Sequence, residues 1–136
     1  MHNLCSPENV FQLMKEVQNK NAEELWVLSI NSHGILIAKE MIFRGTVDMC
    51  PAHPRDIFRF ILQNNSSTFI IVHNHPSGDP TPSEQDLAFT NRILRISKVC
   101  QVPILDHIIL GDNKYISLKQ IGFFNSARIK RATFFE

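Results

Sequence analysis

A short apolar run in the middle of the chain constrains the fold more than any other segment. Residues 68–72 read Thr-Phe-Ile-Ile-Val, so apolar side chains occupy consecutive positions rather than alternate ones. A strand of this kind is covered on both faces, which is typical of a sheet with helices on its two sides. His73 and His75 follow directly. We therefore expect this histidine pair at the end of a central strand.

The segments around this strand alternate between helical and extended patterns. Pro7 after Ser6 is typical of the start of a first helix, and Ser83 fits the cap of a third. The periodicity predicts helices over residues 7–19, 54–62 and 84–99, and further strands over residues 25–30, 35–43, 104–110 and 115–117. The chain is therefore expected to have an α/β fold.

Size and charge allow one domain and exclude some classes of protein. The chain has 136 residues, 43% of them hydrophobic, and a net charge of +1, which does not suggest a general nucleic-acid or anionic-membrane binder. We expect a domain over residues 1–124 and a tail over residues 125–136 that carries a small basic cluster. Three separated cysteines and no long apolar run predict a cytoplasmic protein with no membrane partner.

The chemistry is concentrated in residues 73–86. Side chains two apart on a strand project to the same face, so His73 and His75 can offer two imidazole nitrogens to one ion. Asp86 follows one turn into the next predicted helix and can complete the set. Three protein ligands of this kind are typical of a catalytic zinc site with an open fourth position.

The order of these residues resembles a known family. Two histidines spaced HxH, then seven residues, a serine, two residues and an aspartate form a pattern similar to the JAMM (MPN+) signature. The string His-Asn-His-Pro-Ser-Gly, followed by Pro82, Ser83 and Asp86, resembles the bacterial RadC branch. Further ordered matches are Glu40 and residues 43–46, 53–56 and 106–109.

This resemblance implies a fold, a cofactor and roles. The fold is the three-layer α-β-α JAMM/MPN (cytidine deaminase-like) type, with a mixed sheet flanked by helices. His73, His75 and Asp86 would hold Zn²⁺, Glu40 would be the general base and proton shuttle, and Ser83 would help to stabilise the oxyanion. The implied activity is zinc-dependent hydrolysis of a peptide or isopeptide bond in a protein or peptide substrate whose identity the motif does not give.

Each of these residues also has a structural interpretation. The two histidines could end a strand with ordinary hydrogen bonds, and Ser83 with Asp86 also matches a helix-start pattern. Glu40 could be a charged residue on an edge strand. His107 lies in an apolar run, where a buried, hydrogen-bonded histidine is favoured over a fourth ligand.

Two other functions compete with hydrolysis. One is a DNA-repair or recombination accessory module, as the family's historical name suggests, and the other is an inert scaffold. Full-length members usually carry an N-terminal helix-hairpin-helix region, so we expect either a piece of a longer protein or a short RadC-like protein. Nucleic-acid binding by this domain has no support in its composition, and the oligomeric state stays open, a dimer included.

Overall fold

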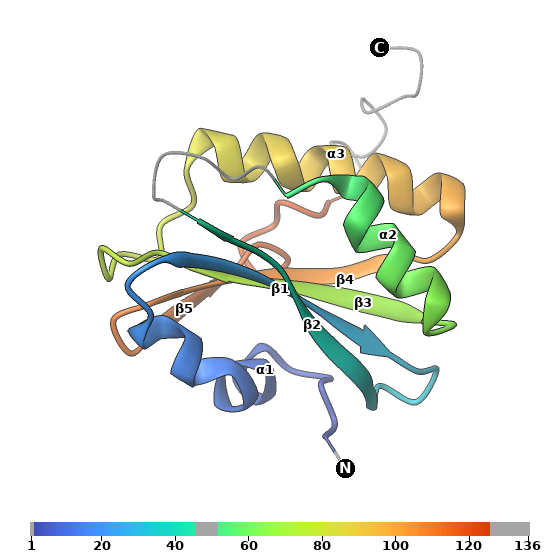
Figure 1. The fold of residues 1–136 in the computed structure, drawn as a ribbon, viewed down its shortest axis with the longest axis horizontal. Coiled ribbons are helices and arrows are strands. Elements are labelled where there is room, and N and C mark those ends of the chain that lie inside the picture. The colour runs from blue at the N-terminus through green and yellow to red at the C-terminus, as the bar shows by residue number, and fades with distance from the viewer. Residues whose placement is uncertain (1, 46–51, 126–136) are drawn as a thin grey trace.

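Five strands form one sheet with helices on both of its faces (Figure 1). The computed structural model describes residues 2–45 and 52–125. In chain order the elements are α1 (Pro7–Met14), the 3₁₀ helix η1 (Lys15–Asn19), β1 (Glu23–Ile30), β2 (Leu36–Gly45), α2 (Pro54–Gln63), β3 (Thr68–Asn74), α3 (Glu84–Cys100), β4 (Ile104–Gly111) and β5 (Lys114–Ser117).

The apolar run forms the centre of the sheet, as predicted. The strand order is β2-β1-β3-β4-β5, so β3 has a neighbour on each side. It pairs antiparallel with β1 and parallel with β4, which makes the sheet mixed. Six of the seven β3 residues are buried, because both faces of the strand are covered.

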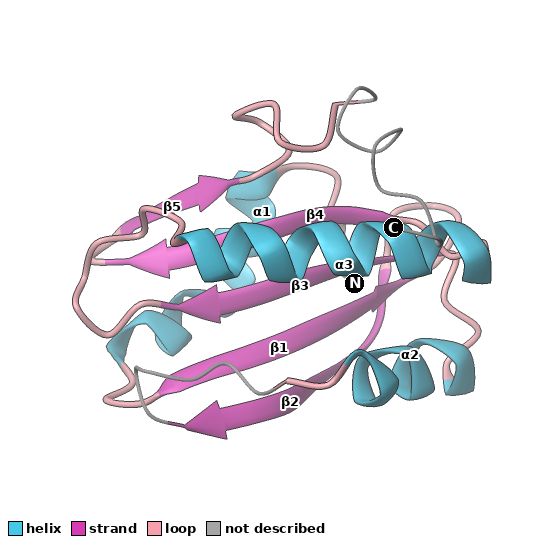
Figure 2. Cartoon of the chain, turned by 90° about the horizontal axis from the view of Figure 1, so that it is seen from above, coloured by secondary structure: helices cyan, strands magenta, loops and turns pink. Residues whose placement is uncertain are grey.

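Two apolar cores separate the layers. On one face, Val10, Phe11 and Met14 of α1 pack with Ile70 and Val72 of β3. On the other face lie α2 and α3, as the view from above shows (Figure 2). They pack on the alternate residues of the same strands. The predicted combination of a mixed sheet with helices on both faces is confirmed. The second face carries the odd-numbered residues of β3, and therefore His73.

Two boundaries differ from the sequence prediction. The first helix was expected to continue to residue 19, but it tightens into the 3₁₀ helix η1 at Lys15. β1 begins at Glu23, two residues before the first apolar position of the segment, because Glu23 and Glu24 pair with Gly45 and Arg44 of β2. The earlier start of β1 matters for the site, because it brings Glu23 into the sheet.

Some sequence expectations concern parts of the chain outside the described residues. These are Cys50 and the basic cluster Arg128, Lys130 and Arg131. Cys5 and Cys100 are free thiols, and Cys100 packs against the core beneath α3, as its helical spacing indicated. Within residues 2–45 and 52–125, no helix combines the length and the apolar character that crossing a membrane requires.

Candidate metal centre

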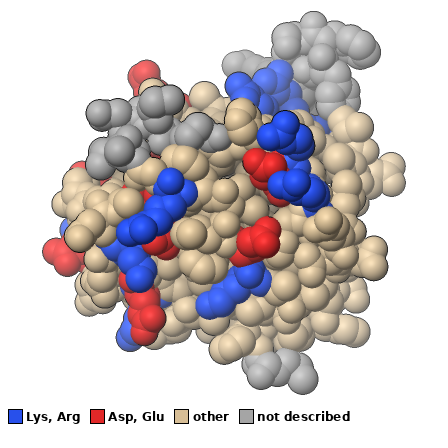
Figure 3. Space-filling model, in the orientation of Figure 1, with Lys and Arg blue, Asp and Glu red and all other residues tan. Residues whose placement is uncertain are grey.

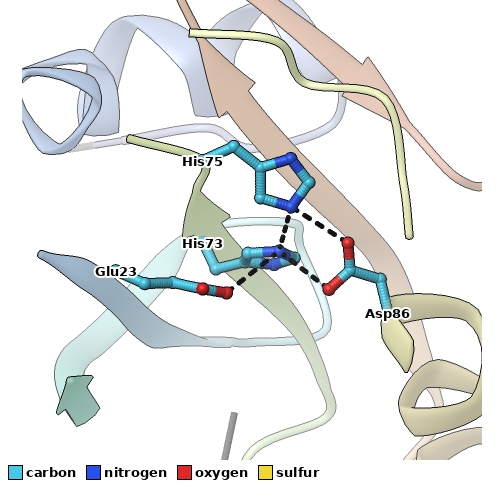
Figure 4. A group of neighbouring side chains, drawn as sticks. All are labelled: Glu23, His73, His75 and Asp86. Carbon is cyan, nitrogen blue, oxygen red and sulfur yellow. Dashed lines mark hydrogen bonds and ion pairs between the residues drawn. The ribbon is translucent and has the colours of Figure 1, made fainter. Parts of the chain in front are cut away.

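The end of β3 and the start of α3 bring three predicted ligands together (Figure 4). His73 and His75 project to the same side because they are two residues apart along an extended segment. Asp86 reaches them from the first turn of α3. His73 and Asp86 are buried, and His75 is partly exposed. The juxtaposition that the sequence predicted for these three residues is therefore present.

The spacing of their polar atoms suits a single small cation. The Nε2 atoms of His73 and His75 lie 3.1 Å apart. Asp86 Oδ1 is 3.2 Å from Nε2 of His73, and Asp86 Oδ2 is 3.0 Å from Nε2 of His75. Ligands of a tetrahedral zinc ion at about 2.0–2.1 Å from the metal are separated by about 3.3 Å. The donor separations are close to this value, with a different Asp86 oxygen facing each histidine, so the three side chains suit a small cation.

A backbone contact orients the ring of His75. Its Nδ1 lies 2.9 Å from the carbonyl oxygen of Asp79, in the loop before α3. A carbonyl can only accept, so Nδ1 carries the proton and donates it. The other nitrogen, Nε2, then faces the cluster. Fixing the outer nitrogen in this way is common for metal-ligating histidines.

A fourth residue, Glu23, completes the group, and the sequence interpretation missed it. The structure places His73, His75, Asp86 and Glu23 so that one ligand atom from each lies within 4.8 Å of the others. Glu23 Oε1 is 3.6 Å from Nε2 of His73, the longest of the contacts drawn (Figure 4). Glu23 comes to this position because Leu25 of β1 pairs with His73.

The residue between the two histidines holds this end of β1 in place. Asn74 Oδ1 accepts a hydrogen bond of 2.7 Å from the backbone N–H of Glu24, and Asn74 Nδ2 donates one of 3.1 Å to the carbonyl of Ala22. Asn74 is fully buried. Its amide therefore bridges the two residues that flank Glu23, and so fixes that carboxylate relative to His73.

Glu40, which the family resemblance implies as the general base, lies outside this cluster. Glu40 is exposed on β2, the edge strand, where it pairs with Val27. Val27 in turn pairs with Ile71, so β1 separates Glu40 from β3. Glu40 is not part of the cluster, whereas Glu23 is. The sequence offered one signal for Glu23, namely its position two residues before Leu25, which puts it on the same face of the strand as Leu25 and Val27.

Ser83 has the structural role that the sequence left open for it. Its Oγ accepts a hydrogen bond of 3.0 Å from the backbone N–H of Asp86, and Asp86 Oδ2 accepts one of 2.9 Å from the N–H of Ser83. This reciprocal pair is a capping box at the start of α3. Ser83 also lines a hollow of about 310 Å³ together with Glu23, His75 and Asp86. In the cap the Ser83 hydroxyl acts only as an acceptor, so its proton is not used there.

Comparison with known proteins decides the family. The RadC-like JAB domain family matches residues 4–123 of the chain. The chain belongs to this family. It is 41% identical over 124 residues to a UPF0758 protein of Enterococcus faecalis, covering 90% of the chain and 53% of that protein. A UPF0758 protein of Desulforamulus reducens is 39% identical over 117 residues, covering 85% of the chain and 52% of that protein.

The similarity extends to a third relative. A UPF0758 protein of Methanosarcina acetivorans is 37% identical over 121 residues, covering 88% of the chain and 53% of that protein. The RadC-like chain thus spans about half the length of the curated relatives it matches. The match to the family confirms the resemblance inferred from the histidine motif.

The carboxyl groups of the RadC-like site have opposite pKa shifts. Burial acts to raise the pKa of Asp86, but the hydrogen bonds from His73 and His75 outweigh it and hold this pKa well below its usual range. Burial raises the pKa of Glu23, and the nearby imidazoles offset this only in part. Asp86 is therefore the more readily ionised of the two acids, and Glu23 is the more readily protonated.

The metal-free domain should show opposite pKa shifts for two of its histidines. Burial acts to lower the pKa of His75, but its hydrogen bonds to Asp86 and to the Asp79 carbonyl raise it above the ordinary 6.5. Burial lowers the pKa of His107 well below 6.5. Because the folded-state pKa of His75 is raised, its charged form stabilises the fold below pH 6.5, and this contribution is lost as the pH rises through the raised value.

Histidine NMR titration of the metal-free protein measures this directly. We expect His75 to titrate above pH 6.5 and His107 to stay neutral to a much lower pH. In Asp86→Asn the pKa of His75 should fall, because a neutral amide does not stabilise the charged imidazolium. The amide oxygen of asparagine can still cap α3, so the helix start should be kept. A wild-type His75 titrating at or below 6.5 would contradict the described contacts.

Proposed function

We propose that this RadC-like domain binds one zinc ion through His73, His75 and Asp86 and hydrolyses an amide bond in a peptide or protein. The observation that carries the proposal is the spacing of the ligand atoms: the two histidine Nε2 atoms are 3.1 Å apart, and each lies 3.0–3.2 Å from one of the two Asp86 carboxylate oxygens. Imidazole and carboxylate donors in this number suit a catalytic zinc ion. A second acid, Glu23, lies beside them and is free to act as a base.

The protein groups around the hollow suit amide hydrolysis. A bound zinc ion would supply a lowered pKa for water, about 7, and polarisation of a carbonyl oxygen. Glu23 accepts a proton from the attacking water and returns it to the nitrogen of the leaving amine. Ser83 donates its free hydroxyl proton to the oxygen on which negative charge develops. We assign the proton transfer to Glu23 rather than Glu40 because only Glu23 lies in the cluster.

The arrangement of surface charge gives less support to DNA binding. On the face shown in Figure 3, basic and acidic side chains are interspersed. At the start of α2, Arg55 and Arg59 both pair with Asp56. A phosphate backbone is bound by a surface of one sign, and mixed charges weaken that attraction. Hydrolysis is therefore the function that the described residues favour.

Metal analysis and a peptide screen test the proposal together. The purified protein should contain one zinc ion per chain and cleave members of a peptide library, with both properties lost after chelation and restored by zinc. His75→Ala should lose zinc and activity, because it removes one of three ligands. His33→Ala is the matched control, since His33 is an exposed histidine in the turn between β1 and β2.

Two results would contradict the proposal. Unchanged zinc content in His75→Ala would show that the metal binds elsewhere. Tight DNA binding by the zinc-loaded protein without cleavage of any peptide would favour the accessory-module alternative.

A further inference from the structure

A completely buried histidine links two of the proposed ligands. His107 on β4 has no exposed surface, and its two ring nitrogens have different partners. Nε2 lies 2.7 Å from Nδ1 of His73, and Nδ1 lies 2.6 Å from Oγ1 of Thr90 on α3. Thr90 in turn donates a hydrogen bond of 2.7 Å to the backbone carbonyl of Asp86, one helical turn earlier. The chain of contacts therefore begins at one ligand residue and ends at another.

Counting protons fixes the direction of each bond. The Thr90 hydroxyl has a single proton, and the carbonyl of Asp86 can only accept, so that proton is donated to the carbonyl. Thr90 Oγ1 must then accept in its contact with His107. It follows that Nδ1 of His107 carries a proton and donates it to Thr90.

The same reasoning extends through His107 to the ring of His73. An imidazolium without an acidic partner on either nitrogen is strongly disfavoured at a site with no exposed surface, so His107 is neutral. With its proton on Nδ1, its Nε2 is an acceptor. His73 must therefore donate from Nδ1, so that in its neutral form Nε2 is the nitrogen without a proton. That nitrogen is the one facing His75, Asp86 and Glu23.

We propose that Thr90 and His107 are positioning residues that hold His73 in the tautomer able to bind a metal. The inference rests on the proposed function in that it takes zinc as the ion bound. This hydrogen-bond relay runs from the backbone carbonyl of Asp86 through Thr90 and His107 to His73. The first turns of α3 therefore supply the ligand Asp86 and also determine which nitrogen of His73 carries the proton. A metal ligand oriented by a hydrogen bond on its outer nitrogen binds more tightly.

Paired variants of α3 test the relay on the full chain. Thr90→Val keeps the shape of the side chain but removes the acceptor for His107, while Thr90→Ser keeps the hydroxyl. Ser97→Ala is the matched control, because the buried Ser97 hydroxyl also donates to a backbone carbonyl of α3 but contacts no histidine. Zinc affinity is measured by competition with a chelator, and histidine tautomers of the metal-free protein are read from nitrogen-15 NMR spectra.

We expect Thr90→Val to lower zinc affinity by about 10–100-fold and to change the tautomer signals of His73 and His107. Thr90→Ser and Ser97→Ala should retain wild-type affinity and spectra. Wild-type spectra in which neutral His73 carries its proton on Nε2 would overturn the relay without recourse to any variant. Wild-type zinc affinity in a folded Thr90→Val protein would also overturn it.

These outcomes are separate from those that test hydrolysis. If the wild-type protein binds zinc and shows the expected tautomers but cleaves no peptide, the relay stands and the proposed activity fails. If peptides are cleaved while Thr90→Val retains wild-type affinity and tautomers, the activity stands and the relay fails.

Discussion

Replacing Glu23 with glutamine should reduce amide hydrolysis by about 10²–10⁴-fold, the usual contribution of a positioned general base, while one zinc ion stays bound. Glutamine has the same shape as glutamate but cannot take up a proton at neutral pH. Burial raises the pKa of Glu23, which favours proton exchange, and its carboxylate lies 3.6 Å from His73. The rate is measured on a peptide substrate, and zinc content on the same sample.

The matched control for this experiment is Glu40→Gln. It makes the same chemical change on the edge strand β2, at an exposed residue outside the cluster. Its activity should equal that of the wild type. A fall in activity confined to Glu40→Gln would restore the original sequence interpretation. Loss of zinc from Glu23→Gln would instead make Glu23 a ligand.

Replacing Asp106 with alanine should lower the free energy of unfolding by about 2–5 kcal/mol, because it leaves buried donors without an acceptor. Asp106 is buried at the start of β4. Its Oδ1 accepts hydrogen bonds from the backbone N–H groups of His107 and Lys119, at 2.7 and 3.1 Å. Its Oδ2 accepts one of 2.5 Å from the Ser117 hydroxyl. One carboxylate thus ties β4 to β5 and to the turn that follows.

Urea-induced unfolding of the metal-free protein measures this loss. Asp106→Asn should have a smaller effect, because it keeps one acceptor oxygen, and because burial already raises the pKa of this carboxyl and disfavours its charge. Asp112→Ala, at an exposed position in the turn between β4 and β5, is the control for a lost carboxylate. A decrease below about 1 kcal/mol for Asp106→Ala would mean that relaxation satisfies the donors.

Local patterns were sufficient to predict most of the candidate metal centre. The apolar run of β3 predicted a central strand, the alternation of His73 and His75 placed both rings on one face, and Ser83 predicted the start of α3 and so the reach of Asp86. His107 was expected to be buried and hydrogen-bonded, and it is. Each of these predictions depends on residues close together in the sequence.

The position of Glu23, the acid that the sequence interpretation missed, depends on residues that are far apart in the sequence. Glu23 joins the cluster because β1 pairs with β3 in a register that sets Leu25 opposite His73, and no pattern within either strand specifies that register. The start of β1 was also predicted too late, since two consecutive acids do not look like a strand. They extend it because Asn74 and β2 supply partners for their backbone.

Asn74 limits how this centre could be moved to another protein. A designer who grafted the His-Asn-His tripeptide and Asp86 onto a foreign sheet would transfer the three proposed ligands. Glu23 would be lost unless the neighbouring antiparallel strand β1 were transferred as well. The amide of Asn74 bonds to the backbone on both sides of Glu23 rather than to its side chain. The smallest portable unit is therefore a strand pair with its following helix, not a sequence motif.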